Sequence, residues 1–137
     1  MTKVECIFNL NSIEDAYLYL LDKFKNKKIF IFKKNNHSEV SEFLWKMQDR
    51  FFIHESENNL RNDLNVPILI GKKFSEKYDQ ILINLEQDYW HKFSRYEIMV
   101  ELITNEDNIK EKARERMKQY QDVGYEIKYI DFKKLTQ

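Results

Sequence analysis

Short apolar runs alternate with amphipathic segments along the whole of this 137-residue chain. Most of the apolar runs are rich in isoleucine, leucine, valine and phenylalanine, which is typical of strands that are buried on both faces of a sheet. The runs that predict strands are VECIFNL at 4–10, KIFIF at 28–32, VPILIG at 66–71, QILINL at 80–85, YEIMVELI at 96–103 and EIKYID at 126–131.

Three amphipathic segments predict helices between these strands. The first, NSIEDAYLYLLDKFKNK, opens with the capping pattern Ser12-x-x-Asp15. The second is HSEVSEFLWKMQDRF, and the third extends from about Glu106 to Val123 and ends at Gly124, which predicts a left-handed cap. The apolar residues that share a face are Ile13, Tyr17, Leu20, Leu21 and Phe24 in the first segment, and Val40, Phe43, Leu44 and Met47 in the second.

This alternation of strands and helices predicts the α/β fold class, with residues 1–137 forming a single domain. The sheet is expected to be mostly parallel and flanked by helices on both faces. The polar stretch ESENNLRNDLN at 55–65 is expected to be the one long loop.

An α/β sheet often binds nucleotides, but the glycine content argues against a phosphate-binding loop. A phosphate cradle requires glycines so that several backbone N–H groups converge on the anion, and this chain has only two. The first strand is followed by NLNSIED, which has no glycine and places two carboxylates where a phosphate would bind. We therefore expect no cofactor.

The charge balance limits the classes of partner. The 23 basic and 23 acidic side chains give a formal net charge of +0, so no overall field draws the molecule to nucleic acid or to an anionic membrane. The apolar runs are too short to span a bilayer, and the N-terminal segment lacks the apolar core of a signal peptide. We expect a cytoplasmic protein in which the single Cys6 has a packing role.

Neither a metal site nor a catalytic motif stands out. The three histidines, His37, His54 and His91, have no second ligand at a suitable spacing. One enzyme alternative remains, because Glu126 and Lys128 on a strand, together with Asp79 before another strand, are similar to the carboxylate and lysine set of metal-dependent nucleases. The simpler interpretation is cross-strand charge on a solvated face.

The third helix combines an apolar stripe with a row of cations. On a helical wheel the stripe contains Ile109, Ala113, Tyr120 and Val123, and Arg116 falls inside it. A cation in that position requires a partner, so Arg116 is expected to be structural and to pair with a buried carboxylate. The residues that lie together on one flank of the stripe are Lys110, Arg114, Lys118 and Gln121.

Met117 is expected at the seam between this cationic flank and the core. Cations beside an apolar depression would suit a ligand that is both acidic and hydrophobic, such as a peptide end whose carboxylate meets Arg114. The alternative is a solvated helix face on which Glu111 and Glu115 pair with the lysines.

A set of sequence blocks resembles the chi subunit of bacterial DNA polymerase III. The blocks, in this order and spacing, are SEFLWKMQDRFFIHE, VPILIG, DQILINL, FSRYEIMVEL and KARERMKQYQDVGYEI. They cover about Ser41 to Ile130, and the first forty residues agree only in their pattern of strand, helix and strand. The most specific feature is Ala113-Arg114-Glu115-Arg116 followed by Tyr120 and Gly124.

The resemblance implies a noncatalytic adaptor with a nucleotide-binding-like fold that lacks the phosphate-binding loop. In this family one surface binds the acidic C-terminal tail of the single-stranded DNA-binding protein, a tail that ends in an aromatic residue with a free carboxylate. Another surface joins the psi subunit, where one exists, and thereby the clamp loader. The tail-binding residues implied here are Arg114, Lys118 and Lys110 of the last helix, with Phe51 and with Trp45 behind the pocket wall.

The chain departs from the family at two positions. Met117 replaces an aromatic residue of the last helix, and Ile53 replaces the proline before the histidine, which leaves either Phe51 or Phe52 as the pocket aromatic. Methionine can still line an apolar pocket because it is unbranched and polarizable, so we expect an adjusted tail affinity. The alternatives to an adaptor are the nuclease-like domain and a direct single-stranded nucleic-acid-binding module.

Overall fold

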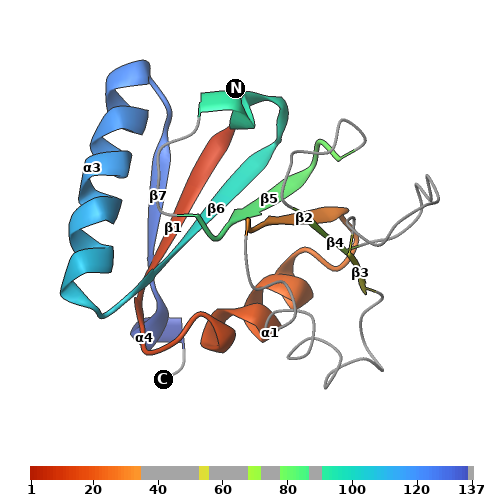
Figure 1. Ribbon diagram of the computed structural model, residues 1–137, viewed down its shortest axis with the longest axis horizontal. Coiled ribbons are helices and arrows are strands. Elements are labelled where there is room, and N and C mark those ends of the chain that lie inside the picture. Colours follow the sequence, from red (N-terminus) through yellow and green to blue (C-terminus); the bar gives the residue numbers. More distant parts are fainter. Residues whose placement is uncertain (35–52, 56–67, 72–77, 87–90, 136–137) are drawn as a thin grey trace.

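The centre of the molecule is one parallel β-sheet, seen in a computed structural model that describes residues 1–34, 53–55, 68–71, 78–86 and 91–135 (Figure 1). Its seven strands lie in the order β3-β4-β2-β5-β6-β1-β7, and every neighbouring pair is parallel. The bounds are β1 Lys3–Leu10, β2 Ile29–Phe32, β3 Ile53–Glu55, β4 Ile68–Gly71, β5 Ile81–Asn84, β6 Ile98–Thr104 and β7 Ile127–Asp131. The predicted α/β class with a parallel sheet is confirmed.

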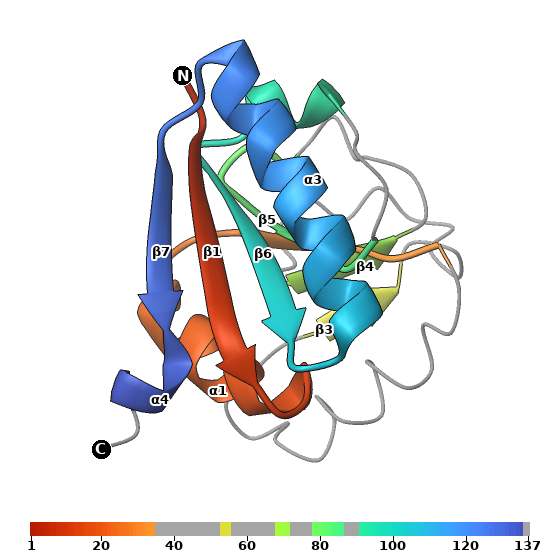
Figure 2. The ribbon, with the colours of Figure 1, turned by 90° about the vertical axis from the view of Figure 1, so that its left-hand side faces the viewer.

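Helices α1 (Glu14–Lys23) and α3 (Asp107–Val123) cover opposite faces of this sheet (Figures 1 and 2). The crossover from β1 to β2 passes in one direction along the sheet, and the crossover from β6 to β7 passes in the other. Because such crossovers are right-handed, opposite directions place their helices on opposite faces. The topology therefore leaves α3 above the end of the sheet where β6, β1 and β7 are neighbours.

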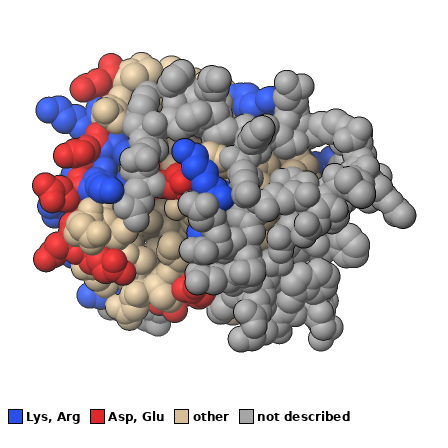
Figure 3. Space-filling view, viewed as in Figure 1, with Lys and Arg blue, Asp and Glu red and all other residues tan. Residues whose placement is uncertain are grey.

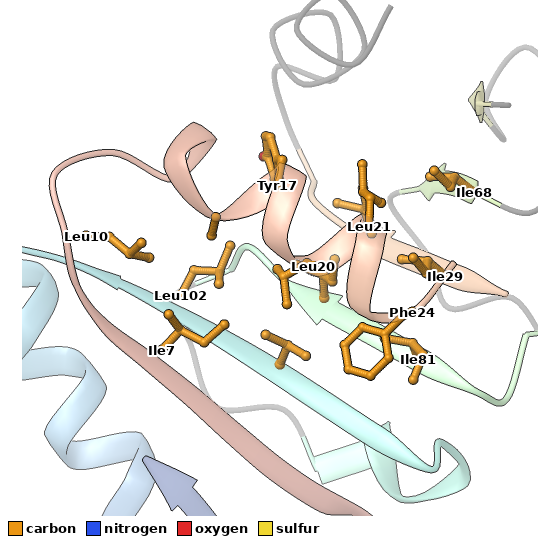
Figure 4. Packing of buried hydrophobic residues seen from close by; sticks show 14 of the residues in the cluster. Ile7, Leu10, Tyr17, Leu20, Leu21, Phe24, Ile29, Ile68, Ile81 and Leu102 are labelled. Atoms are coloured by element: carbon orange, nitrogen blue, oxygen red, sulfur yellow. The ribbon is translucent and has the colours of Figure 1, made fainter. Parts of the chain in front are cut away.

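Two apolar cores correspond to these two faces. Figure 4 shows the core under α1, in which Tyr17, Leu20 and Leu21 pack on strand residues such as Ile29 and Ile81. The core under α3 contains Val4, Cys6, Met99, Ala113, Met117 and Tyr120, together with Phe93 and other aromatic residues. Strands β2, β4 and β5 are buried at every position because they lie inside the sheet with a core on each side.

Helix α1 follows its predicted pattern closely. Tyr17, Leu20, Leu21 and Phe24 are buried, and Ile13 packs against the same core. The carboxylate of Asp15 accepts a hydrogen bond from the backbone N–H of Ser12 at 3.3 Å, which is one half of the predicted capping box. The Ser12 side chain does not provide the other half, and the helix begins at Glu14.

Helix α3 ends as predicted, with Gly124 in the left-handed region at φ 104°. The backbone N–H groups of Gly124 and Tyr125 donate to the carbonyls of Gln121 and Tyr120, which closes the last turn. The prediction for Val123 is wrong, because its side chain is 56% exposed. Val123 is the last residue of the helix, whose final turn extends past the apolar surface that covers Tyr120.

Three short elements were not predicted: strand β3, the 3₁₀ helix η2 (His91–Arg95) and helix α4 (Phe132–Leu135). Segments of three to five residues carry too little periodicity to identify them from sequence. The predicted helix at 37–51 and nearly all of the predicted loop at 55–65 lie outside the described residues. Within the described ranges, no helix has the length and apolar character needed to cross a membrane.

Candidate functional site: a basic and apolar pocket beside α3

A pocket of about 480 Å³ lies beside α3, where the sheet continues to its β7 edge. Figure 2 shows the arrangement, with α3 in front of the sheet and β1 and β7 emerging next to it. The residues that line the pocket are Cys6, Phe8, Asn9, Ile103, Lys110, Ala113, Arg114, Met117, Lys118, Gln121 and Tyr129. One wall is therefore helical, and the floor and the other wall come from strands.

The helical wall contains the cationic flank that the sequence predicts. Lys110, Arg114 and Lys118 follow each other at intervals of four residues, so their side chains lie one above another on one side of α3. Gln121 continues this side of the helix by nearly one more turn. The structure thus brings Lys110, Arg114, Met117 and Lys118, four of the six predicted site residues, to one pocket.

The other two predicted residues, Phe51 and Trp45, lie outside the described residues. The same is true of Phe52, so the structure does not decide between the two phenylalanines. These assignments remain predictions.

Met117 lies deeper than the helical wheel predicts. Its side chain is only 5% exposed and belongs to the core under α3, yet it also lines the pocket. The seam position predicted for this residue is therefore only partly right. A substitution at Met117 will affect the packing of α3 as well as the pocket, because the same side chain contributes to both.

The strand side of the pocket includes residues that the sequence analysis did not assign to a site. Cys6 and Tyr129 are partners in the β1–β7 register, so both side chains project toward the face that α3 covers. Phe8 lies two residues after Cys6 on the same strand. Only the pairing of β7 with β1 brings these residues to the helix, and sequence alone gives no signal for that pairing.

Asn9, which also lines the pocket, lies at an irregularity in the register of β1 between Ile7 and Leu10. Its φ of 62° is in the left-handed region, which asparagine tolerates better than most residues. Its side-chain Nδ2 donates to Oδ1 of Asp131 at 2.9 Å, and this bond lowers the pKa of the Asp131 carboxyl. The contact ties the end of β1 to the end of β7.

A buried polar cluster fixes the orientation of α3. Arg116 donates from Nε and Nη2 to Oε2 of Glu101, at 3.1 Å and 2.8 Å. Asn84 Nδ2 and Tyr120 Oη donate to Oε1 of the same carboxylate, at 2.8 Å and 2.9 Å. The predicted structural role of Arg116 is confirmed, and its partner is a carboxylate on β6.

This cluster sets which side of the helix faces the pocket. Asn84, Glu101 and Cys6 are successive partners in the β5–β6 and β6–β1 registers, so they form a row across the sheet beneath α3. Arg116 and Tyr120 are bound to the middle of that row. Because α3 cannot rotate without breaking these bonds, Arg114 and Lys118 stay directed along the side next to β7.

Burial perturbs the titratable groups of this row. Complete burial raises the pKa of Glu101, while Arg116 and the hydrogen bonds from Asn84 and Tyr120 act in the opposite direction. Burial and the nearby Glu101 raise the pKa of the Cys6 thiol to about 12, although Arg116 lowers it. Cys6 is thus a neutral packing residue at neutral pH, as expected from its apolar surroundings.

The cations of the pocket have no protein partner within the described ranges. No described residue forms an ion pair or a side-chain hydrogen bond with Lys110, Arg114 or Lys118, and none pairs with Glu111 or Glu115. Figure 3 shows both signs of charge along the edge of the molecule that α3 forms. The alternative, in which these glutamates pair with the lysines, is therefore not observed among the described residues.

The residues of the nuclease alternative are not brought together. Asp79 precedes β5 and Glu126 precedes β7, and β6 and β1 lie between those strands, which implies a separation of about 14 Å. Lys128 is the register partner of Glu5, on the α1 face of the sheet. No group of three potential metal ligands occurs among the described residues. Sheet order therefore keeps Asp79 away from Glu126 and Lys128, so the described residues do not form the ligand set on which the nuclease interpretation was based.

The first turn of α1 is also a poor site for phosphate. Glu14 and Asp15 occupy this turn, where the partial positive charge of a helix N-terminus would otherwise attract an anion. Their carboxylates would repel a phosphate, in agreement with the absence of glycine from the preceding connection.

Fold and pocket together define a class of protein: a parallel α/β domain whose exposed site is suited to binding an anionic, partly apolar ligand. The chain belongs to the family described as DNA polymerase III chi subunit, HolC, whose model matches residues 1–128. The match includes the first forty residues, for which the sequence blocks gave only a pattern of elements. No curated protein matches the chain. Members of this family are non-catalytic accessory subunits of the polymerase.

Proposed function

We propose that this accessory subunit is an adaptor that binds the acidic C-terminal tail of the single-stranded DNA-binding protein and links it to the clamp loader. The observation that carries the proposal is the alignment of Lys110, Arg114 and Lys118 along one wall of an apolar pocket. A peptide that is acidic and ends in an apolar side chain with a free carboxylate matches both properties of this pocket.

Arg114 is the residue proposed to bind the terminal carboxylate. It lies in the middle of the cationic column, and its planar guanidinium can donate two parallel hydrogen bonds to the two oxygens. Lys110 and Lys118, one turn away on each side, would attract the acidic residues upstream in the tail. The last aromatic ring of the tail would enter the pocket beside Met117.

A single tail is expected to bind weakly. Ordering a flexible peptide costs entropy that a few anchoring contacts must offset, so the dissociation constant should be roughly micromolar. An oligomeric partner that carries several tails would strengthen attachment through effective concentration. Weak individual contacts would allow an adaptor to exchange while the replication machinery moves.

The link to the clamp loader requires a second surface, and in bacteria that have a psi subunit the link would pass through psi. The pocket lies at the β7 edge of the sheet, so the face covered by α1 and the opposite sheet edge are separate from it. A tail and a second partner could therefore be bound together without competing for the pocket.

Calorimetric titration tests tail binding directly. The probes are a peptide copying the last residues of the host's single-stranded DNA-binding protein, the same peptide without its final residue, and the same peptide with an amidated C-terminus. The intact peptide should bind, and the other two should bind at least tenfold more weakly, because each removes one anchor. Equal binding of all three would contradict the proposal.

A single-stranded oligonucleotide provides the comparison for direct nucleic-acid binding. A module that bound DNA itself would bind the oligonucleotide with an affinity that falls steeply as salt increases. The adaptor is expected to prefer the peptide. Tight binding of bare DNA without peptide binding would contradict the adaptor proposal and support a direct single-stranded nucleic-acid-binding module.

A further inference from the structure

We propose that two copies of this chain associate through the outer edge of β7, where β7 of one copy pairs antiparallel with β7 of the other. The sheet would then continue from one copy into the next about a two-fold axis. This inference does not rest on the proposed function, because Glu126, Ile127 and Lys128, which carry it, do not line the pocket beside α3.

Strand β7 forms one edge of the described sheet. It comes last in the strand order and pairs with β1 on one side, and no described strand pairs with its other side. Figure 2 shows β7 at the outer edge of the sheet, with β1 on its inner side. The outward N–H and C=O groups of an edge strand can form a ladder with a strand of another molecule.

The backbone groups that point outward belong to alternate residues of β7. The N–H of Val4 donates to the carbonyl of Glu126 at 3.1 Å. In a parallel ladder every second residue bonds to the same neighbour, so Glu126 and Lys128 direct their backbone groups toward β1. Ile127 and Tyr129 therefore direct theirs outward.

These outward groups fit an antiparallel pair that is centred on Ile127. In this register Ile127 exchanges both of its backbone hydrogen bonds with Ile127 of the second copy, and the N–H of Tyr129 donates to the carbonyl of Tyr125. The N–H of Tyr125 already donates to the carbonyl of Tyr120. The ladder between the two copies would therefore end at Tyr125.

The charges of the edge are complementary to themselves in this register. Glu126 and Lys128 are exposed, and neither forms an ion pair with a described residue. A centre on Ile127 places Glu126 of each copy opposite Lys128 of the other, so two favourable pairs form at once. A centre on Lys128 would oppose two lysines, and a centre on Tyr129 would place Lys128 opposite Ile130. This self-complementarity is the reason to propose a second copy as the partner.

Apolar side chains at the same edge support the proposal. Tyr129 is 52% exposed, Val123 just before the strand is 56% exposed, and Leu135 just after it is 46% exposed. Antiparallel pairing places the end of one copy that carries Leu135 beside the end of the other that carries Val123. It also places Tyr129 opposite Tyr125, an aromatic pair of the kind that stabilises antiparallel strands.

Sedimentation equilibrium of the full chain over a series of concentrations tests the association. The parent should show a reversible equilibrium between monomer and dimer. Glu126→Lys opposes lysines at both charged pairs and Lys128→Glu opposes glutamates, so each should raise the dissociation constant of the dimer at least about fourfold. An equimolar mixture of these two variants should associate as the parent does, because every lysine then faces a glutamate.

Matched controls make the same charge changes on the exposed side of α3. Glu111→Lys and Lys112→Glu should leave the dissociation constant unchanged, because neither residue lies near β7 in the chain or lines the pocket next to it. Ile127→Pro removes the outward N–H at the centre of the pair and no bond to β1. This variant should be a monomer with the parent's circular dichroism spectrum.

A parent that is monomeric at every concentration would overturn the proposal and identify Lys128 as a charge that protects the edge from pairing. A dimer that neither charge reversal weakens would also overturn it. So would two charge-reversal variants that fold normally but fail to associate when they are mixed.

Discussion

Arg116 on α3 and Glu101 on β6 form a buried ion pair in which two guanidinium nitrogens donate to one carboxylate oxygen, at 3.1 Å and 2.8 Å. Both side chains are almost fully excluded from solvent. Two positions earlier on the same helix, Arg114 is exposed and lines the pocket. Two arginines in one turn of helix thus have different roles, one structural and one available to a ligand.

The first prediction concerns Arg116→Ala, which should lower the free energy of unfolding by about 3 to 5 kcal/mol. The substitution leaves the Glu101 carboxylate buried without its cationic partner, and the bonds from Asn84 and Tyr120 do not replace that charge. Urea unfolding followed by circular dichroism measures the loss. Arg114→Ala serves as the control and should change stability by less than 1 kcal/mol, and equal effects would contradict this division of roles.

The second prediction is that Arg114→Ala weakens binding of the tail peptide by about 1.5 to 3 kcal/mol, as for the loss of a charged hydrogen bond at an interface. Calorimetric titration at constant salt gives the affinity. Lys112→Ala is the matched control, because Lys112 is an exposed cation of the same helix that does not line the pocket. If both variants lose the same affinity, general charge attraction and not a carboxylate contact explains binding.

The third prediction concerns Met117, which both lines the pocket and belongs to the core under α3. Met117→Tyr should tighten binding of the tail peptide by up to about 1 kcal/mol, since the neighbouring pocket of about 480 Å³ can receive the larger ring. Met117→Glu should nearly abolish binding, because its carboxylate would repel an acidic tail and compete for Arg114 and Lys118.

Stability must be measured for the same Met117 variants. Because Met117 is 5% exposed, Met117→Glu places a carboxylate in the core under α3 and should also destabilise the fold. The helical wheel alone would predict that both variants fold equally well. Met117→Leu nearly conserves the side-chain volume, so it should lower the free energy of unfolding by less than about 1.5 kcal/mol. This variant is the reference for packing effects. A Met117→Glu variant that binds like the parent would place the tail site elsewhere.

The fourth prediction concerns the thiol of Cys6, whose pKa is raised from 9.0 to about 12. At pH 8 the raised pKa reduces the thiolate population of the folded protein about 1000-fold relative to the unfolded chain, so alkylation by iodoacetamide should slow at least as much. Cys6 is the only cysteine, so the labelling rate by mass spectrometry reports on it alone. Comparable rates with and without urea would contradict the burial of this group.

The raised pKa of Cys6 also predicts how stability depends on pH. The folded state retains the thiol proton between pH 9 and about 12, where the unfolded chain loses it, so this group lowers stability as pH rises through that range. Below pH 9 its stabilising contribution is fully present. Cys6→Ala should remove this part of the alkaline decline in an unfolding series.

Much of the fold was predictable because the strongest signals are local. The runs IFIF, ILIG and ILIN contain hardly any polar residues, and each forms a strand buried on both faces. Gly124 ends α3 in the left-handed region, which an isolated sequence can predict because glycine adopts it without a steric cost. Val123 was mispredicted because a helical wheel does not show where the surface beneath the helix ends.

The helical wall of the candidate site was predictable because its signal is also local. Lys110, Arg114 and Lys118 share a side of one helix, so their proximity follows from helical geometry alone. The partner of Arg116 was predictable only as a carboxylate, because many acidic residues could have met it. Its identity depended on the pairing of β5, β6 and β1, which places Glu101 beneath that turn of α3.

The sequence by itself determined the strands and helices, the need of Arg116 for an acidic partner and the cationic side of α3, since each depends on spacing within one segment. The tertiary structure decided that Tyr129 and Met117 line one pocket, and that two strands, β6 and β1, separate the strands next to Asp79 and Glu126. Sheet order and register join segments that are distant in the chain, and nothing in their local composition specifies which strand lies beside which. The pocket exists because β7 pairs with β1 and so completes the surface beside α3.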